Sequence, residues 1–311
     1  MQKTKIEYLD YTWNPIAIRC TSVSDGCKNC WHLRMAKRFS GMDIFNSDVK
    51  NAYSGMKPVI RREELEAPLR KKKPVRIGVQ FMGDMFHNEV YNDQIAAIFG
   101  VMQACTQHTF FVLTKRPGRM CDWLTWSECE SKKCEMYTEV FLRSKAQEFG
   151  VDFKDDSDRY VYGSHDNIWL GVSVEDQKTA DNRISEILNI GSYNLWVSCE
   201  PLLGCIDFSK IGLRRTDNGI GMQSWEKYDA LNGSRFYQTW GGPWIWNGLR
   251  STRLSFVVAG SETGPGARPC DLDWLRSIRD QCNDANVPFF LKQINAKKER
   301  MLDGRLHEEM P

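Results

Sequence analysis

Short runs of apolar residues recur along the chain, and each run is nearly continuous rather than alternating with polar positions. Continuous apolar runs of this length are typical of parallel strands that are covered on both faces. We therefore predict strands at 75–81, 108–114, 168–174, 195–202, 254–260 and 288–293.

Between these runs, apolar residues recur at the spacing of one helix face. The pattern predicts helices over 92–105, 177–190 and 271–282, the last with Asp271 as its N-cap. Strands that alternate with helices indicate a parallel sheet. We expect one α/β domain over residues 1–311, a partial TIM-type barrel of about six βα units. An open doubly wound sheet is the alternative.

Two segments interrupt this rhythm, and both are longer than an ordinary βα loop. Residues 122–166 are polar and charged, whereas residues 211–253 are dense in Trp, Tyr, Gly and Arg. We predict that both are insertions. The second has the composition of a cap that stacks on DNA bases. Alternatively, Trp240, Trp244 and Trp246 form a small core within it.

Bulk composition excludes little. The chain has 311 residues, 41% of them hydrophobic, and a formal net charge of +2. No apolar run reaches the length of about 18 residues that a membrane span needs, and the first residues do not resemble a secretory signal. We expect a reducing cytoplasm, where eleven cysteines favour metal binding or chemistry over a disulfide framework.

Polar residues follow nearly every predicted strand. In a TIM-type barrel, such positions line the active site. The alternative is that they form structural ion pairs across the barrel mouth. The strand-end residues are Asp84, Lys115, Arg116, Ser173, Glu175, Glu200, Ser261, Glu262 and Lys292.

Three cysteines lie close together near the N-terminus. Cys20, Cys27 and Cys30 have the spacing C-x6-C-x2-C. A structural zinc needs four ligands, and His32 offers a fourth, although it lies close to Cys30. A [4Fe–4S] cluster held by three thiolates keeps one iron open to a ligand. Cys129 and Cys134 form a separate C-x4-C pair, which is a weaker signal.

This cysteine motif resembles that of the radical S-adenosylmethionine superfamily. The common spacing there is C-x3-C-x2-C, with an aromatic residue where this chain has Asn29. From about residue 11 onward, the chain resembles a phage and bacterial family that is counted as radical S-adenosylmethionine-like and shares C-x6-C-x2-C. The matching segments include "FMGDMFH", "QHTFFVLTKRPGRM", "IWLGVSVEDQKTADNRI", "SCEPLLGCIDF" and "GSETGPGARPCDLDWLRSIRDQC". The chain departs from the family pattern at Ser261-Glu262-Thr263 and at Ile294.

The resemblance implies a [4Fe–4S] cluster on Cys20, Cys27 and Cys30. It implies that S-adenosylmethionine binds the open iron, and that an electron from flavodoxin or ferredoxin cleaves it to a 5′-deoxyadenosyl radical. Among the strand-end residues, we expect some to contact the cofactor and others to be catalytic, while Arg116 and Arg268 hold a phosphate or carboxylate. The expected cofactor contacts are Asp84, Ser173, Glu175 and Ser261; the expected catalytic residues are Lys115, Glu200, Glu262 and Lys292.

The substrate that the resemblance implies is a modified thymine in phage DNA, inside an infected bacterial cell. The activity is isomerisation of an N-linked glycyl-thymidine to its C-linked form, with the base flipped out of the duplex. Another nucleic-acid or peptide substrate is the alternative for an enzyme. A zinc-stabilised nucleic-acid-binding protein that uses Cys20, Cys27, Cys30 and His32 is the alternative without catalysis.

Overall fold

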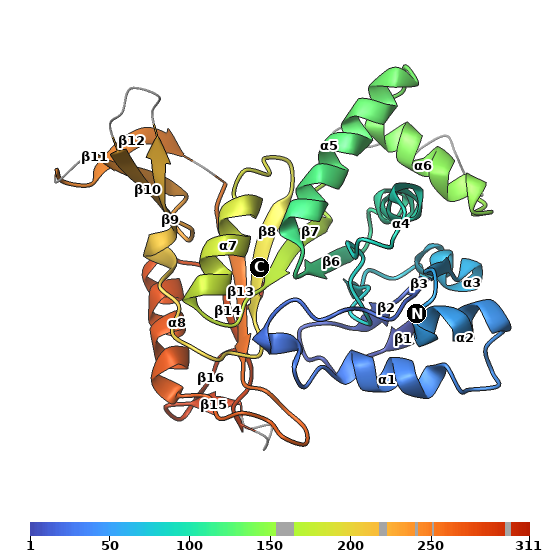
Figure 1. Cartoon of the computed structure of the whole chain (residues 1–311), viewed down its shortest axis with the longest axis horizontal. Helices are drawn as coiled ribbons and strands as arrows, with labels where there is room; N and C mark the ends of the chain where they lie inside the picture. The colour runs from blue at the N-terminus through green and yellow to red at the C-terminus, as the bar shows by residue number, and fades with distance from the viewer. Residues whose placement is uncertain (154–164, 218–222, 240–241, 251, 296–299) are drawn as a thin grey trace. The chain divides into compact units, whose positions relative to one another are not determined.

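The computed structural model describes residues 1–153, 165–217, 223–239, 242–250, 252–295 and 300–311. The chain divides into two compact units, an N-terminal unit of Met1–Leu170 and a C-terminal unit of Gly171–Pro311. Figure 1 shows both units as a mixture of helices and strands, as expected for an α/β protein. The single barrel domain stays a prediction.

The bounds of the elements are as follows. Up to the unit boundary the order is β1 (Gln2–Lys3), β2 (Tyr11–Trp13), β3 (Ile16–Ala17), η1 (Asp25–Cys27), α1 (Trp31–Phe39), α2 (Ser47–Ser54), β4 (Val59–Ile60), α3 (Arg62–Leu65), η2 (Ala67–Arg70), β5 (Arg76–Val79), α4 (Asn92–Ala104), β6 (Thr109–Thr114), α5 (Pro117–Lys133) and α6 (Thr138–Glu148). The boundary falls within β7 (Ile168–Ser173). After it come α7 (Gln177–Ile187), β8 (Asn194–Cys199), η3 (Phe208–Lys210), β9 (Ile211–Asp217), β10 (Gln223–Asp229), β11 (Ser234–Thr239), β12 (Ile245–Arg250), β13 (Leu254–Gly260), α8 (Leu272–Asp284), β14 (Phe289–Gln293), β15 (Met301–Leu302) and β16 (Arg305–Leu306).

The main sheet follows the order of the chain. Its eight hydrogen-bonded strands are β1-β2-β5-β6-β7-β8-β13-β14. The pairs β2–β5, β5–β6, β8–β13 and β13–β14 are parallel, whereas β1 is antiparallel to β2. All six predicted strands are confirmed, as β5, β6, β7, β8, β13 and β14. A doubly wound sheet reverses its strand order at a switch point, so the observed order contradicts that alternative.

In the N-terminal unit, the apolar face of the strands packs on α4. Trp13 and Phe110, on β2 and β6, are fully buried, with 5.9 Å between their ring centroids. The other layer of this packing is α6, which lies against α4 (Figure 1). The two helices approach so closely at Gly100 that an added Cβ would lie 2.3 Å from the carbonyl oxygen of Leu142. A side chain at position 100 would therefore push the helices apart.

In the C-terminal unit, aromatic residues of β8, β13 and β14 fill the core. Trp196 and Phe256 lie on paired strands and stack at 6.3 Å between ring centroids. The predicted helices at 177–190 and 271–282 are confirmed as α7 and α8, and 92–105 as α4. Asp271 is the N-cap of α8, because its side chain accepts a hydrogen bond from the backbone N–H of Asp273.

The predicted insertions contain regular structure. Residues 122–166 hold most of α5, all of α6 and the segment 154–164, which lies outside the described residues. Residues 211–253 form a separate antiparallel sheet of order β12-β11-β10-β9, which lies beside α7 (Figure 1). At the base of this sheet, the N–H of Gly212 donates to Asp181 of α7 over 3.1 Å. Within the described ranges, the helices are all too short or too polar to cross a membrane.

Candidate functional site

The three clustered cysteines lie on one short segment of the N-terminal unit. Cys27 ends η1, and Cys30 is the N-cap of α1. The segment is tightened by backbone hydrogen bonds from Cys27 to Ser24 over 2.9 Å and from Cys30 to Cys27 over 3.2 Å. All three thiols are free and partly buried. The local fold therefore presents three unpaired sulfur donors within eleven residues, as the spacing predicts.

Cys20 is held by contacts from outside this segment. Its backbone N–H donates to Nε2 of His32 over 3.3 Å, and its sulfur lies 3.6 Å from Nη1 of Arg116. His32 is 2% exposed, and burial lowers the pKa of its imidazole to about 4. The ring is therefore neutral at pH 7, as accepting a hydrogen bond at Nε2 requires. In this arrangement, Nε2 of His32 supports the backbone of Cys20.

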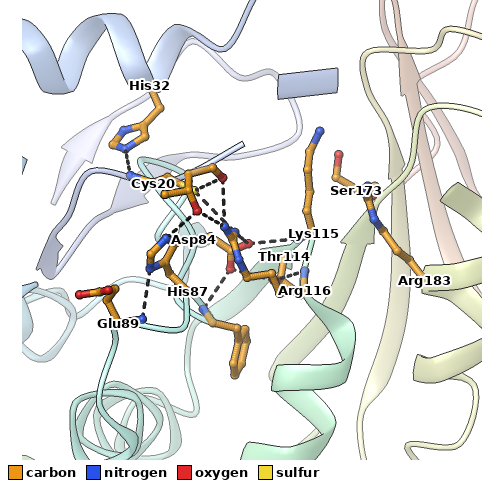
Figure 2. Close-up of polar contacts among 12 residues, drawn as sticks. Cys20, His32, Asp84, His87, Glu89, Thr114, Lys115, Arg116, Ser173 and Arg183 are labelled. Atoms are coloured by element: carbon orange, nitrogen blue, oxygen red, sulfur yellow. Dashed lines mark hydrogen bonds and ion pairs between the residues drawn. The ribbon is translucent and has the colours of Figure 1, made fainter. Parts of the chain in front are cut away.

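The guanidinium of Arg116 joins Cys20 to the end of β5 (Figure 2). Its Nη1 donates to Oδ2 of Asp84 over 2.9 Å, and both side chains are about nine-tenths buried. The other contacts of Asp84 are with Phe86, Thr114 and Lys115: Oδ1 accepts from the Phe86 N–H and the Thr114 hydroxyl, and Oδ2 accepts from the Lys115 N–H. The Asp84 carboxylate thus takes four donors from the protein itself. We predicted that Asp84 binds the cofactor, and the structure gives it a positioning contact with Arg116.

A second set of contacts fixes Thr21, the residue after Cys20. Nη2 of Arg116 donates to the hydroxyl of Thr21 over 2.9 Å and to its carbonyl oxygen over 3.0 Å. Nε2 of His87 lies 2.9 Å from the same hydroxyl. Nδ1 of His87 accepts from the N–H of Glu89, so Nε2 carries the proton and donates to Thr21. Two strand ends therefore clamp the backbone that carries the first cysteine.

The electrostatic environment differs between the cysteines. Burial, with the nearby charge of Asp84, raises the pKa of the Cys20 thiol, and Arg116 opposes this rise. Burial also acts to raise the pKa of Cys27, but hydrogen bonds at Val23 and Ser24 and the charge of Lys115 outweigh it and lower the pKa. A thiolate is the form that binds a metal, so Lys115 favours the metal-binding form of Cys27.

A pocket of about 480 Å³ lies next to the first cysteine, within the N-terminal unit. Pockets of a few hundred Å³ are the usual size for small-molecule sites. The wall is formed by residues before and after Cys20, by the end of α2 and by the turn after β5. It includes Cys20, Thr21, Met56, His87 and Glu89. Cys20 and the residues that clamp it therefore border a space large enough for a small molecule.

The cysteines fit an iron–sulfur cluster by donor type. Three free thiols on one segment, one with a lowered pKa, are the soft ligands that such clusters take. Among the described residues, no group of three or more His, Cys, Asp and Glu side chains gathers in a metal-binding arrangement. The structure therefore supports the choice of ligands by their chemistry and their shared segment.

In the C-terminal unit, Ser173 and Glu175 follow β7. Glu175 is 1% exposed and forms an ion pair with Arg183 of α7, at 3.1 Å and 3.2 Å from its two carboxylate oxygens. Arg183 also donates to the carbonyl oxygen of Ser173. The hydroxyl of Ser173 donates to the carbonyl oxygen of Glu200 over 3.0 Å. These contacts join the end of β7 to the end of β8.

Glu200 and Lys292 form the next pair of strand-end residues. Nζ of Lys292 lies 3.1 Å from the carboxylate of Glu200, and the hydroxyl of Ser198 lies 3.4 Å from the same group. Gly260 makes room for it, because an added Cβ there would lie 2.8 Å from Oε1 of Glu200. The structure therefore brings together two predicted catalytic residues, from β14 and the end of β8.

Ser261 and Glu262 follow β13 and have different surroundings. Glu262 accepts from Nε and Nη2 of Arg268 at 2.9 Å and 2.6 Å, and from the Arg268 N–H. The Ser261 hydroxyl is buried and makes no hydrogen bond within the described parts of the chain. Its carbonyl oxygen accepts from Gln293. The predicted anion-binding Arg268 thus has a carboxylate partner in this chain.

Sequence reasoning missed several residues that organise these sites. They lack a motif of their own: Thr21 and His87 lie beside a cysteine and a strand-end aspartate, and Arg183 lies on a helix. Their signal was position, since each is a polar residue next to one already selected. The missed residues are Thr21, His87, Thr114 and Arg183.

One family model matches residues 3–311, which is nearly the whole chain, and its description reads "Protein of unknown function (DUF5131)". The search of curated proteins and the search of solved structures each found no match.

Proposed function

The chain belongs to the DUF5131 family, and we propose from its own residues that it is a radical S-adenosylmethionine enzyme. The observation that carries the proposal is the segment with Cys20, Cys27 and Cys30. Three partly buried, unpaired thiols lie there, and the first is fastened to the strand ends by Arg116. A disulfide or a packed core would leave no reason for this arrangement, whereas a cluster ligand must be held in place.

We assign Cys20, Cys27 and Cys30 as the ligands of a [4Fe–4S] cluster. Such a cluster supplies the electron that cleaves the sulfonium C–S bond of S-adenosylmethionine. The protein holds and orients the ligands: Arg116 and His32 fix Cys20, and the charge of Lys115 favours the thiolate of Cys27. The pocket beside Cys20 has room for a small molecule.

We further propose that the main sheet is part of a TIM-type barrel. Its strand order follows the chain, with parallel neighbours on both sides of β5 and β13, which is how such barrels are built. Polar residues occur at the C-terminal ends of its strands, where barrel enzymes place their sites. In the C-terminal unit these include the pair Glu200–Lys292, which we assign to moving a proton at the substrate.

The proposed reaction is isomerisation of N-linked glycyl-thymidine in phage DNA to the C-linked form, with flavodoxin or ferredoxin as reductant and the host cytoplasm as location. The support is the resemblance of the chain's segments described above and the aromatic, basic composition of residues 211–253. Breaking a glycyl Cα–H bond suits radical chemistry, because the amino and carbonyl groups on either side stabilise the resulting radical. A flipped base must also be held outside the duplex.

The alternative of a zinc site made by the three cysteines and His32 has less support. Nε2 of His32 accepts the Cys20 N–H, and the ring is 2% exposed. To bind zinc through Nε2, the ring would have to give up this contact. The backbone N–H of Cys20 would then need another acceptor.

Anaerobic reconstitution with iron and sulfide tests the proposal. We expect about four irons per chain and an absorbance band near that of iron–sulfur proteins. We also expect reductive cleavage of S-adenosylmethionine, followed by chromatography of 5′-deoxyadenosine. Cys20→Ala, Cys27→Ala and Cys30→Ala should each abolish cleavage.

Cys129→Ala and Cys134→Ala are the matched controls, because both are exposed thiols outside the segment. Their iron content should equal that of the wild type. A folded protein that takes zinc and no iron would contradict the proposal. Mass spectrometry of nucleosides from host DNA, with active or Cys27→Ala protein, then tests the substrate.

A further inference from the structure

The sheet β9–β12 has one face on which aromatic side chains gather around a lysine. Residues paired across strands share a face, as do residues two apart on one strand. The register pairs Lys227 with Phe236 and Phe236 with Trp246, and Trp225 lies two residues before Lys227. We call this the aromatic face, formed by Trp225, Lys227, Phe236, Trp244 and Trp246.

The ammonium of Lys227 lies between two of the rings. Its Nζ is 4.9 Å from the ring centroid of Trp244 and 5.4 Å from that of Phe236, within the range of cation–π attraction. The outer rings are open to solvent: Trp225 is 41% exposed and Trp246 is 53% exposed. Large aromatic side chains left exposed on one face mark an interaction surface.

The opposite face is already occupied. There Arg235 forms an ion pair with Glu226 at 2.6 Å, and Tyr228 is 2% exposed. The base of the sheet is fixed within the C-terminal unit, since Ala230 exchanges backbone hydrogen bonds with Phe208 and Leu254. The aromatic face is therefore carried on a fixed support.

We propose that the aromatic face binds single-stranded nucleic acid by stacking unpaired bases on Trp225 and Trp246, with Lys227 contacting the phosphate backbone. Exposed aromatic rings on a basic surface are the common elements of such sites. Residues 211–253 carry six Lys and Arg against three Asp and Glu, which complements a polyanion. An apolar protein partner would bury the Lys227 ammonium without a counter-charge, which is unfavourable. A phosphodiester supplies that counter-charge.

This inference rests on the proposed function for one point, since it names the surface that would meet an unpaired stretch of the DNA substrate. Binding itself needs no cluster and is measured on the full-length protein without cofactor. Iron in a protein that does not bind DNA through this face would refute the inference alone. DNA binding by a protein that takes no iron would refute the proposed function alone.

The test is the affinity for a fluorescein-labelled oligodeoxythymidine of about 12 nucleotides, measured by fluorescence anisotropy. We expect Trp246→Ala to weaken binding roughly 5- to 100-fold, the loss of one stacked base. Trp246→Phe should retain most of the affinity because it keeps a ring, whereas Trp246→Leu should lose it. Ile245→Ala is the matched control, because Ile245 is the preceding residue, faces the other side and is 43% exposed.

Salt dependence separates the role of the lysine. For single strands, each phosphate neutralised contributes about 0.7 to the slope of log affinity against log salt. Lys227→Gln should therefore reduce this slope by about 0.7, and Trp246→Ala should leave it unchanged. Equal losses for Ile245→Ala and Trp246→Ala would overturn the inference. So would wild-type protein that does not bind the oligonucleotide, or that self-associates through Trp246.

Discussion

The backbone N–H of Cys20 donates a hydrogen bond to Nε2 of His32, with 3.3 Å between the two nitrogen atoms. This contact gives the histidine a role that needs no metal. It ties the first cysteine to α1, the helix that the third cysteine caps. The spacing between Cys30 and His32 therefore serves the shape of the cysteine segment.

Replacing His32 tests this role. His32→Phe leaves the Cys20 N–H without its acceptor, so we expect the free energy of unfolding to fall by about 1–3 kcal/mol. His32→Gln can still offer an oxygen and should lose less. Urea denaturation measures both. If His32 were instead a zinc ligand, His32→Gln would lose bound zinc, so metal analysis of the purified variants gives the opposing result.

The ion pair Asp84–Arg116 is the second target. Removing one partner of a buried pair leaves the other charge uncompensated, which costs about 3–5 kcal/mol. We expect Asp84→Ala to lower the free energy of unfolding by that amount, and Asp84→Ala with Arg116→Met to lower it by less than the sum of the single changes. Denaturant titrations of the four proteins of this cycle provide the measurement.

The same variant distinguishes positioning from cofactor binding. If Asp84 acts through Arg116, Asp84→Asn with an intact fold should take up iron less completely. If Asp84 binds S-adenosylmethionine directly, iron uptake stays normal and the affinity for S-adenosylmethionine falls. Iron analysis and equilibrium dialysis with labelled S-adenosylmethionine separate these outcomes.

Gly260 tests the packing around Glu200. A Cβ at this position would lie 2.8 Å from the Glu200 carboxylate, so Gly260→Ala must displace the pair Glu200–Lys292. We expect a loss of about 1–3 kcal/mol in the free energy of unfolding, as for other overpacked sites. Gly191→Ala is the control, since an added Cβ there meets no atom within 4 Å. Equal stability of the two variants would show that the pair yields easily.

Lys292 tests the proposed proton transfer. Positioned acids and bases contribute about 10²–10⁴-fold in rate, so Lys292→Gln should reduce substrate turnover by that range while iron content stays normal. Lys210→Gln, at an exposed lysine paired with Asp207, should leave turnover unchanged. Turnover per iron, rather than per chain, is the quantity to compare, because it removes differences in cluster loading.

The main strands could be predicted because burial on both faces leaves a direct mark on the sequence. Each continuous apolar run became a strand, and Asp271 became an N-cap. The segment 211–253 gave no such mark, because its strands form a separate antiparallel sheet with an exposed face. Pattern alone indicated an insertion there, and the pairing of Lys227 with Phe236 came from the structure. Trp240, one of the aromatic residues selected from the sequence, lies outside the described residues.

The cysteine segment could likewise be selected from spacing, whereas its supports could not. Asp84 was selected because it follows a strand, but its four donors come from positions up to Arg116, on another strand's end. Contacts between such distant positions depend on which strands become neighbours. Sequence pattern gives the strands, and only the fold gives the neighbours.

The order of the main sheet bears on how the chain folds during synthesis. Because neighbouring strands follow one another along the chain, each strand that leaves the ribosome meets a partner that is already present. Synthesis proceeds from the N-terminus at about 5–20 residues per second. The cysteine segment and its clamp at the ends of β5 and β6 are therefore complete before β8 has been made, so the protein can prepare its thiol ligands early. The step from β8 to β13 is different, because β9–β12 must emerge between two strands that pair directly. The wait at this step falls on an edge strand, β8, whose backbone stays unpaired until β13 arrives.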